Sequence, residues 1–144
     1  MKQMIIILMT GIISMPFAMS QTEGWQTLEE TIEQSSLSNK STLLVFSGSD
    51  WCKPCIQFKK EILESQAFNS FAENHLDLYI ADFPYRKQNK LPKQQEEYNE
   101  ALAEKYNKGG LFPHIILLDE RGKTIKQIQF SKQTTPDSFI AELQ

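Results

Sequence analysis

The chain has 144 residues and a formal net charge of −3, with 40% hydrophobic and 23% charged residues. This length suits one domain with a proper core and is short for two. The mildly acidic balance gives no electrostatic reason to bind nucleic acid, and no long basic run is present. One spaced set of cations is interpreted as a solvated loop, not as a phosphate-binding patch: Arg86, Lys87, Lys90 and Lys93.

Residues 1–20 have the pattern of a secretory signal peptide. Lys2 gives the positive start, an apolar stretch over 4–13 follows, and small residues stand before a cleavage point at Gln21. The apolar stretch is short for a membrane span, and an uncleaved N-terminal anchor is the alternative. We therefore expect an exported, periplasmic protein with a mature domain over 21–144, in a compartment where disulfides persist.

The mature chain begins with a predicted helix and a predicted buried strand. Trp25, Leu28 and Ile32 fall at helical spacing, which predicts an amphipathic helix that the polar residues 38–41 end. The continuous apolar run over 43–46 predicts a strand covered on both faces, as in a parallel sheet.

A second helix is predicted to begin at or near Cys52. Cys55, Phe58 and Ile62 share one helical face. Pro54 then lies in the first turn, where proline is tolerated because the amide it lacks would be unpaired there.

The rest of the chain predicts alternating elements. They are a helix over 65–75, a strand over 76–82, a loop over 83–93, a helix over 93–106, a buried strand over 115–118, a strand over 123–130 and a last helix from 136. The alternation of the strand over 123–130 slips between Ile125 and Ile128, which indicates a bulge. The order predicts one α/β domain in which a βαβ unit precedes an antiparallel hairpin.

The only two cysteines, Cys52 and Cys55, lie in the segment SDWCKPC. At a helix N-terminus, unpaired amides and the helix dipole favour a thiolate, and Lys53 adds a positive charge. The thiolate is the species that attacks a disulfide, and Cys55 lies one helical turn further on. The motif therefore favours a redox pair.

The sequence favours two other interpretations of the motif less. A structural disulfide across two intervening residues would close a very small loop and stabilise the fold little. A zinc site needs about four ligands, and the only histidines, His75 and His114, do not have the required spacing. His75 is interpreted as a helix-end residue.

The segment WCKPC (51–55) after an apolar strand resembles the W-C-x-P-C active site of the thioredoxin superfamily. Pro113, before the strand over 115–118, stands where that superfamily has a cis-proline against the redox cysteines. The resemblance covers about 25–144 and is strongest to secreted bacterial proteins related to the C-terminal domain of the transmembrane disulfide reductase. It implies a thioredoxin fold, a central mixed β-sheet flanked by helices, here with an extra N-terminal helix.

The resemblance also implies roles for the site residues. Cys52 would be the attacking nucleophile, and Cys55 would resolve the mixed disulfide. Pro113 would shape the substrate groove, and the backbone of Phe112 would pair with an extended substrate strand. Trp51 would cap one side of the site.

The chain departs from thioredoxin at the buried acid six residues before the first cysteine, where it has Phe46. That acid would take the proton from Cys55. Without it, the Cys55 proton must pass to water or to another group, for which the candidates are Glu61, Asp82 and His114.

Two further departures concern partners and potential. Lys53 stands where thioredoxin has glycine in C-G-P-C, and Lys53 and Pro54 together help to set the potential. Phe112 is bulkier than the usual residue before the cis-proline, which narrows the range of partners. The loop over 83–93 is interpreted as an insertion, with a recognition element as the alternative.

We therefore expect a thiol-disulfide oxidoreductase that exchanges its C-K-P-C pair with exported protein clients through a mixed disulfide on Cys52. No organic cofactor or metal is implied. The proline beside Cys55 resembles the reducing members, so we expect a monomeric reductant supplied by a membrane electron-donor protein. The alternatives are a thioredoxin-fold binding or chaperone module without redox turnover, and a dedicated disulfide-forming oxidant.

Overall fold

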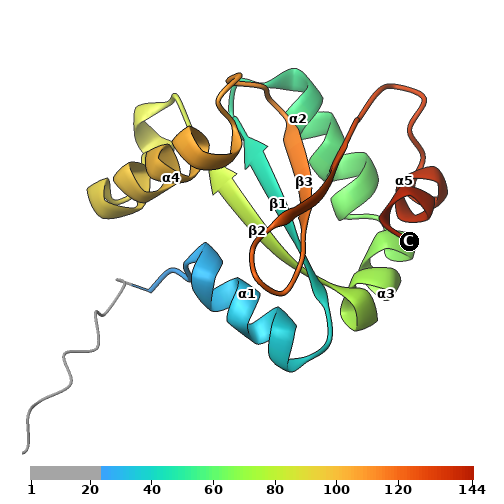
Figure 1. The fold of residues 1–144 in the computed structure, drawn as a ribbon. Helices are drawn as coiled ribbons and strands as arrows, with labels where there is room; N and C mark the ends of the chain where they lie inside the picture. The colour runs from blue at the N-terminus through green and yellow to red at the C-terminus, as the bar shows by residue number, and fades with distance from the viewer. Residues whose placement is uncertain (1–23) are drawn as a thin grey trace, which may run out of the picture.

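The computed structural model describes residues 24–144 (Figure 1). The predicted signal segment, residues 1–20, lies outside the described part. Among the helices of residues 24–144, none is long and apolar enough to cross a membrane.

Four strands form one mixed sheet in the order β2-β1-β3-β4. The parallel pair is β1 (Ser41–Ser47) with β2 (Leu76–Asp82). The antiparallel strand β3 (His114–Leu118) pairs with β1 on its other side and with β4 (Thr124–Ile128). The predicted βαβ unit and hairpin are both confirmed.

Helices cover both faces of the sheet (Figure 1). One face carries α1 (Leu28–Leu37) and α4 (Lys93–Tyr106). The other carries α2 (Lys53–Phe58), its π-helical continuation η1 (Lys59–Leu63), α3 (Gln66–His75) and α5 (Pro136–Leu143). A 3₁₀ turn, η2 (Lys87–Asn89), lies in the loop between β2 and α4.

The central strand β1 divides the core into two layers. Leu43 and Val45 face the α2 side, whereas Leu44 and Phe46 face α1 and α4, and each is at most 1% exposed. Burial of such a side chain contributes about 1.5–3 kcal/mol. A strand covered on both faces needs an unbroken apolar run, which is the reason that residues 43–46 were correctly predicted as buried.

The first helix begins later than the apolar spacing from Trp25 suggests. Thr27 is its N-cap: the Thr27 hydroxyl accepts from the Glu30 amide, and the Glu30 carboxylate accepts from the Thr27 amide. This capping box satisfies two amides at the helix end and fixes the start at Leu28.

The predicted strand over 123–130 is shorter in the structure. It ends at Ile128, and its irregularity lies opposite Leu117 and Leu118, which pair with Lys126 and Thr124. Ile125 is therefore the extra residue of the bulge and is 51% exposed.

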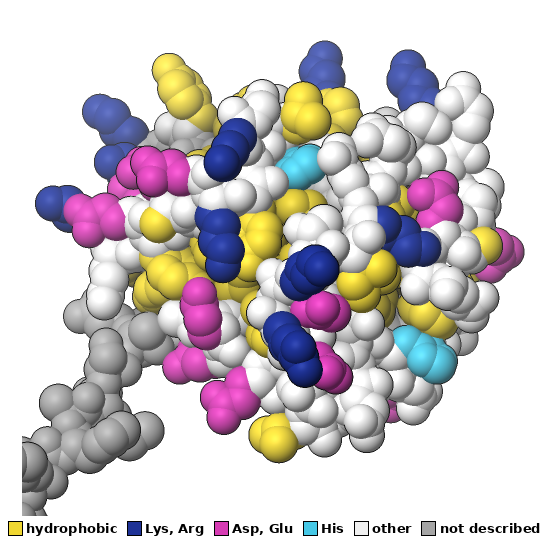
Figure 2. All heavy atoms as spheres, in the orientation of Figure 1, with side chains coloured by type: hydrophobic (Ala, Val, Ile, Leu, Met, Phe, Trp, Pro, Cys, Tyr) yellow, Lys and Arg dark blue, Asp and Glu magenta, His cyan; other side chains and the backbone are white. Residues whose placement is uncertain are grey.

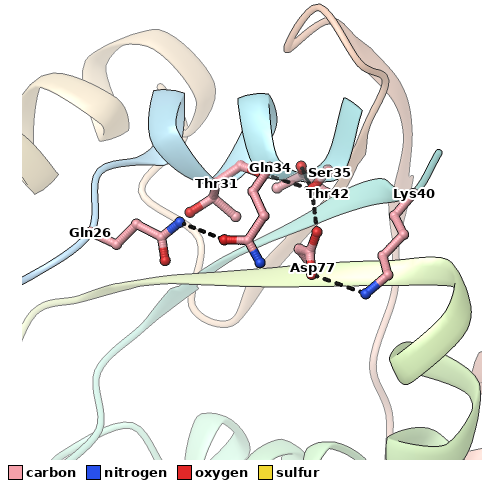
Figure 3. Close-up of polar contacts among 7 residues, drawn as sticks. All are labelled: Gln26, Thr31, Gln34, Ser35, Lys40, Thr42 and Asp77. Atoms are coloured by element: carbon pink, nitrogen blue, oxygen red, sulfur yellow. Dashed lines mark hydrogen bonds and ion pairs between the residues drawn. The ribbon is translucent and has the colours of Figure 1, made fainter. Parts of the chain in front are cut away.

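A buried polar network fixes α1 to the sheet (Figure 3). Thr42 of β1 donates its hydroxyl to the Ser35 hydroxyl at 2.9 Å. The single Ser35 proton has two acceptors at 2.9 Å, an Asp77 carboxylate oxygen of β2 and the Thr31 carbonyl. Lys40 pairs with the second Asp77 oxygen at 3.4 Å. Ser35 and Thr42 are fully buried, so α1 is held by directional contacts as well as by apolar packing.

Candidate active site

A tight turn after β1 leads into the motif. The Cys52 amide donates to the Gly48 carbonyl at 2.9 Å, and Cys52 has an extended backbone as the N-cap of α2. The helix begins at Lys53 and has Pro54 in its first turn. The predicted position of Cys52 at a helix start is confirmed.

Cys52 and Cys55 form a disulfide with Cα atoms 5.2 Å apart. The Cys55 amide donates to the Cys52 sulfur at 3.2 Å, the contact that a capping side chain makes. Once the disulfide is reduced, this amide and the helix dipole favour a thiolate on Cys52. The two cysteines are only 4% and 2% exposed, so the residues around them control access to the sulfur atoms.

Trp51 covers the turn before the disulfide. A Cβ atom on Gly48 would lie 2.3 Å from Trp51 Cε2, so only glycine leaves room for the indole here. The indole N–H donates to the Phe83 carbonyl at 2.7 Å. Trp51 remains 47% exposed and forms a half-open wall beside the cysteines.

Phe112, which precedes Pro113 and β3, contacts the motif through Trp51. The peptide bond between Phe112 and Pro113 is cis, and the next residue, His114, pairs with Phe46 at the end of β1. The Phe112 ring lies 5.3 Å from the Trp51 ring and 5.6 Å from the Phe83 ring, between ring centres. The structure therefore places Phe112 and Trp51 in one aromatic cluster at the site.

Phe46 has no exposed surface and faces the α1 and α4 side of the sheet. Its ring stacks on Phe83 at 6.4 Å and lies 5.9 Å from the His114 ring. The position that holds an acid in thioredoxin is therefore part of an aromatic core in this chain.

The three candidate replacements for that acid lie in different environments. Asp82 ends β2 and lines a cavity of about 190 Å³ together with Cys55. Its carboxylate accepts from the Ser49 amide at 2.9 Å and from the Ser49 hydroxyl. Glu61 instead accepts from the exposed Gln57 amide group.

The His114 ring makes its hydrogen bond to the end of α4, not to Cys55. Its Nε2 lies 3.0 Å from the Tyr106 carbonyl. Burial lowers the pKa of the His114 ring, and the Tyr106 contact opposes this in part. A neutral ring donates to Tyr106 through Nε2–H, and within residues 24–144 its buried Nδ1 has no hydrogen-bond partner. Asp82 is thus the candidate that shares a cavity with Cys55.

Asp50 is a site residue that the sequence did not reveal. Its carboxylate accepts from the Tyr85 amide at 2.8 Å, the Arg86 amide at 2.9 Å and the Asn89 side chain at 3.0 Å. The Tyr85 contact is the largest cause of a lowered Asp50 pKa. The loop over 83–93 is therefore attached to the residue two places before Cys52.

Among the residues that the structure describes, no group of three or more His, Cys, Asp or Glu side chains could hold a metal ion.

A disulfide that caps a helix after a buried strand, together with a cis-proline immediately before the strand that pairs with it, defines a dithiol–disulfide site on a thioredoxin fold. The chain belongs to the thioredoxin-like domain family, whose sequence profile matches residues 28–144.

Individual proteins show the same relationship. A curated relative, "Disulfide bond reductase DsbH" of Chlamydia pneumoniae, is 36% identical over 106 residues, which cover 74% of this chain and 62% of that protein. The chain thus spans less than two thirds of that relative. The solved structure "DsbH Oxidoreductase" has a TM-score of 0.73 at 32% identity and covers 83% of this chain and 80% of its own.

A more distant structure has the same fold. The oxidised C-terminal domain of DsbD from Neisseria meningitidis has a TM-score of 0.53 at 20% identity, covering 81% of this chain and 90% of its own. The predicted thioredoxin fold is confirmed.

Proposed function

We propose that this protein is a thiol-disulfide oxidoreductase that reduces disulfides in exported proteins. The observation that carries the proposal is the Cys55 amide donating to the Cys52 sulfur at the start of α2. This contact is in place to favour a Cys52 thiolate after reduction. Reduction, rather than oxidation, of the client is supported by the relative named a disulfide bond reductase and by the proline next to Cys55.

The exchange has two steps. The Cys52 thiolate attacks one sulfur of a client disulfide, forms a Cys52–client bond, and releases the other client sulfur, which takes up a proton. Cys55 then loses its proton and attacks the Cys52 sulfur, which closes the Cys52–Cys55 disulfide and releases the second client thiol. The client gains two electrons, and a donor must return two electrons to the protein.

The surrounding residues support these steps in our proposal. The backbone of Phe112 and the ring of Pro113 receive an extended client segment, with the Trp51 indole as the opposite wall. Lys53 favours the thiolate by its charge. Pro54 lacks an amide in the first turn, which leaves the Cys55 amide as the donor to the Cys52 sulfur.

We assign Asp82 as the acceptor of the Cys55 proton. The cavity that Asp82 shares with Cys55, about 190 Å³, has room for water, which occupies about 30 Å³ per molecule in the liquid. Water in this cavity would carry the proton from the Cys55 sulfur to the carboxylate. The Ser49 contacts hold that carboxylate at the cavity wall.

Two cysteine variants test the reaction. Cys52→Ser should abolish turnover of a disulfide substrate, whereas Cys55→Ser should accumulate mixed disulfides that non-reducing electrophoresis resolves. If the protein's effect on its clients were kept in full by Cys52→Ser, without any disulfide turnover, the result would instead support a binding or chaperone module. Failure of Cys55→Ser to capture any exported protein would contradict the exchange role.

The direction of electron transfer is tested by the reduction potential of the Cys52–Cys55 pair, measured by equilibration in graded glutathione buffers. Related proteins span about −270 mV for thioredoxin to about −120 mV for a strong oxidant. We expect a value below about −220 mV, in the reducing part of that range. A value above about −150 mV, near the oxidising end, would make the protein a disulfide-forming enzyme.

We also propose that the protein is exported to the periplasm, acts as a monomer and receives electrons from a membrane protein. N-terminal sequencing of the periplasmic protein should give Gln21 as the first residue, and recovery with the membrane fraction would indicate an uncleaved anchor.

Light scattering should give the mass of one chain. A variant of the membrane donor that lacks the donor's resolving cysteine should form a stable mixed disulfide with the oxidised protein.

A further inference from the structure

The loop between β2 and α4, residues 83–92 (FPYRKQNKLP), is rich in cations although the whole chain has a net charge of −3. Three of its residues are Lys or Arg and none is Asp or Glu: Arg86, Lys87 and Lys90. Within residues 24–144, the ion pairs join other residues, so these three cations have no carboxylate partner at pairing distance.

Acidic groups face this loop from two sides. Asp50 is occupied by the Tyr85 and Arg86 amides and the Asn89 side chain. On the other side, Asp82 of β2 and Glu96 and Glu100 of α4 line a hollow together with Phe83 and Pro84. These acids bind or border the base of the loop.

The loop is attached to the active site by contacts at several points. Besides the Asp50 contacts, the Phe83 amide donates to the Ser47 carbonyl at 2.8 Å, and the Phe83 carbonyl accepts from the Trp51 indole. The cations are therefore presented from a backbone held beside Cys52. A surface fixed before binding loses less entropy when a partner docks.

The loop and the aromatic cluster that Phe83 joins also carry exposed apolar side chains. Tyr85 is 85% exposed, Leu111 is 52% exposed and Trp51 is 47% exposed. Figure 2 shows Lys or Arg and hydrophobic side chains projecting side by side along the upper edge of the molecule, the edge at which β1 ends in Figure 1. Rigid aromatic side chains beside charges are common in recognition surfaces.

We propose that residues 83–92 are a client-recognition element that selects polypeptides with acidic residues near the cysteine that pairs with Cys52. The occupant is an extended segment of the client: its carboxylates lie against Arg86, Lys87 and Lys90, and its apolar residues cover Tyr85. This proposal rests on the proposed exchange function and adds the chemical class of the client.

The test compares three cyclic peptides of equal length, each with one internal disulfide and with two Glu, two Gln or two Lys beside one cysteine. Stopped-flow measurement gives the second-order rate constant for oxidation of the reduced protein. At low ionic strength the Glu peptide should react about tenfold or more faster than the Lys peptide, because charge attraction raises association rates by about 10–10³-fold. At about 1 M salt, with a screening length of about 3 Å, the difference should vanish.

Two triple variants with the same change in charge locate the effect. Arg86→Gln, Lys87→Gln and Lys90→Gln together should bring the Glu-to-Lys rate ratio close to one. The matched control neutralises three cations outside this loop, two of which line a hollow beside α1, and it should keep the ratio: Lys105→Gln, Arg121→Gln and Lys123→Gln. Circular dichroism checks that both variants fold.

The outcomes separate the two proposals. Failure of the wild-type protein to reduce the neutral bis(2-hydroxyethyl) disulfide would contradict the exchange function itself. Equal rates for the Glu and Lys peptides in a protein that does reduce the neutral compound would overturn the recognition proposal alone. A ratio that survives in the Arg86, Lys87 and Lys90 variant would overturn it as well, because the selectivity would then lie elsewhere.

Discussion

Asp82 is bound to Ser49 and lines the cavity beside Cys55. Asp82→Asn keeps the shape of the side chain and removes the charge that accepts a proton. Closure of the Cys52–Cys55 disulfide should then slow by about tenfold or more at neutral pH, since a positioned acid or base typically contributes about 10²–10⁴-fold. Acid quenching followed by mass spectrometry measures the mixed disulfide that accumulates.

The pH profile separates this role from a structural one. The deficit of Asp82→Asn should shrink as the pH rises towards about 8.5, where a cysteine thiol ionises unaided. Glu61→Gln is the matched control and should follow the wild-type profile, because the exposed Glu61 accepts from Gln57 and does not line the cavity that Asp82 shares with Cys55. An equal deficit at every pH would show that Asp82 only supports the fold.

Residues of the motif were more predictable than their partners. The positions of Cys52, Cys55 and Pro54 follow from local rules of helix starts. The replacement of the buried acid by Phe46 can be read directly from the sequence. The contact of Asp50 with Tyr85 and Arg86 could not be predicted, because it depends on the path of a loop that has no periodic pattern. The only sequence signal for this contact was an acidic residue, Asp50, directly before Trp51.

The attachment of α1 to the sheet depends on Ser35. Ser35→Ala leaves the buried Thr42 hydroxyl and one Asp77 oxygen without their partner, which costs about 1–3 kcal/mol. Urea unfolding should show this loss after correction with Ser36→Ala, an exposed serine on the same helix that reports the change in helix propensity. Equal stability of the two variants would mean that water replaces the Ser35 hydroxyl.

The loop over 83–92 should stay attached at neutral and mildly acidic pH. Its contact with Asp50 lowers the pKa of that carboxyl below the usual value, about 3.9 in unfolded chains. The contact therefore stabilises the loop above that value and is lost as the pH falls through the lower folded pKa.

Amide chemical shifts of Tyr85 and Arg86 measure this directly. They should stay constant from about pH 7 to 5 and move only below about 3.9. Asp50→Ala should show the shifted positions at every pH. A transition at about pH 6, near the ordinary histidine pKa, would show that another group holds the loop.

The whole fold should depend little on the disulfide. Cys52 and Cys55 are three positions apart, so the loop is much shorter than the 15-residue loop for which closure contributes about 3 kcal/mol. Reduction should lower the free energy of unfolding by less than that. Urea midpoints of the oxidised protein, the reduced protein and the double variant Cys52→Ser and Cys55→Ser give the comparison. Loss of cooperative unfolding on reduction would identify the disulfide as a structural bond.

The two-layer core and the order of elements were predictable because both depend on the spacing of apolar residues. Leu43–Phe46 indicates burial on two faces, and the helical spacing of Cys55, Phe58 and Ile62 indicates one buried face. The ends of elements were less predictable. The capping box at Thr27 depends on side-chain contacts that periodicity does not contain. The bulge itself was indicated by the slip in alternation, and the backbone pairing sets its position at Ile125.

Gly48 has an evolutionary consequence. Since the Trp51 indole occupies the space where a Cβ atom would stand, any descendant with a side chain at position 48 must place its tryptophan elsewhere. One substitution outside the C-x-x-C segment would thereby change the shape that clients meet and leave the sulfur chemistry intact.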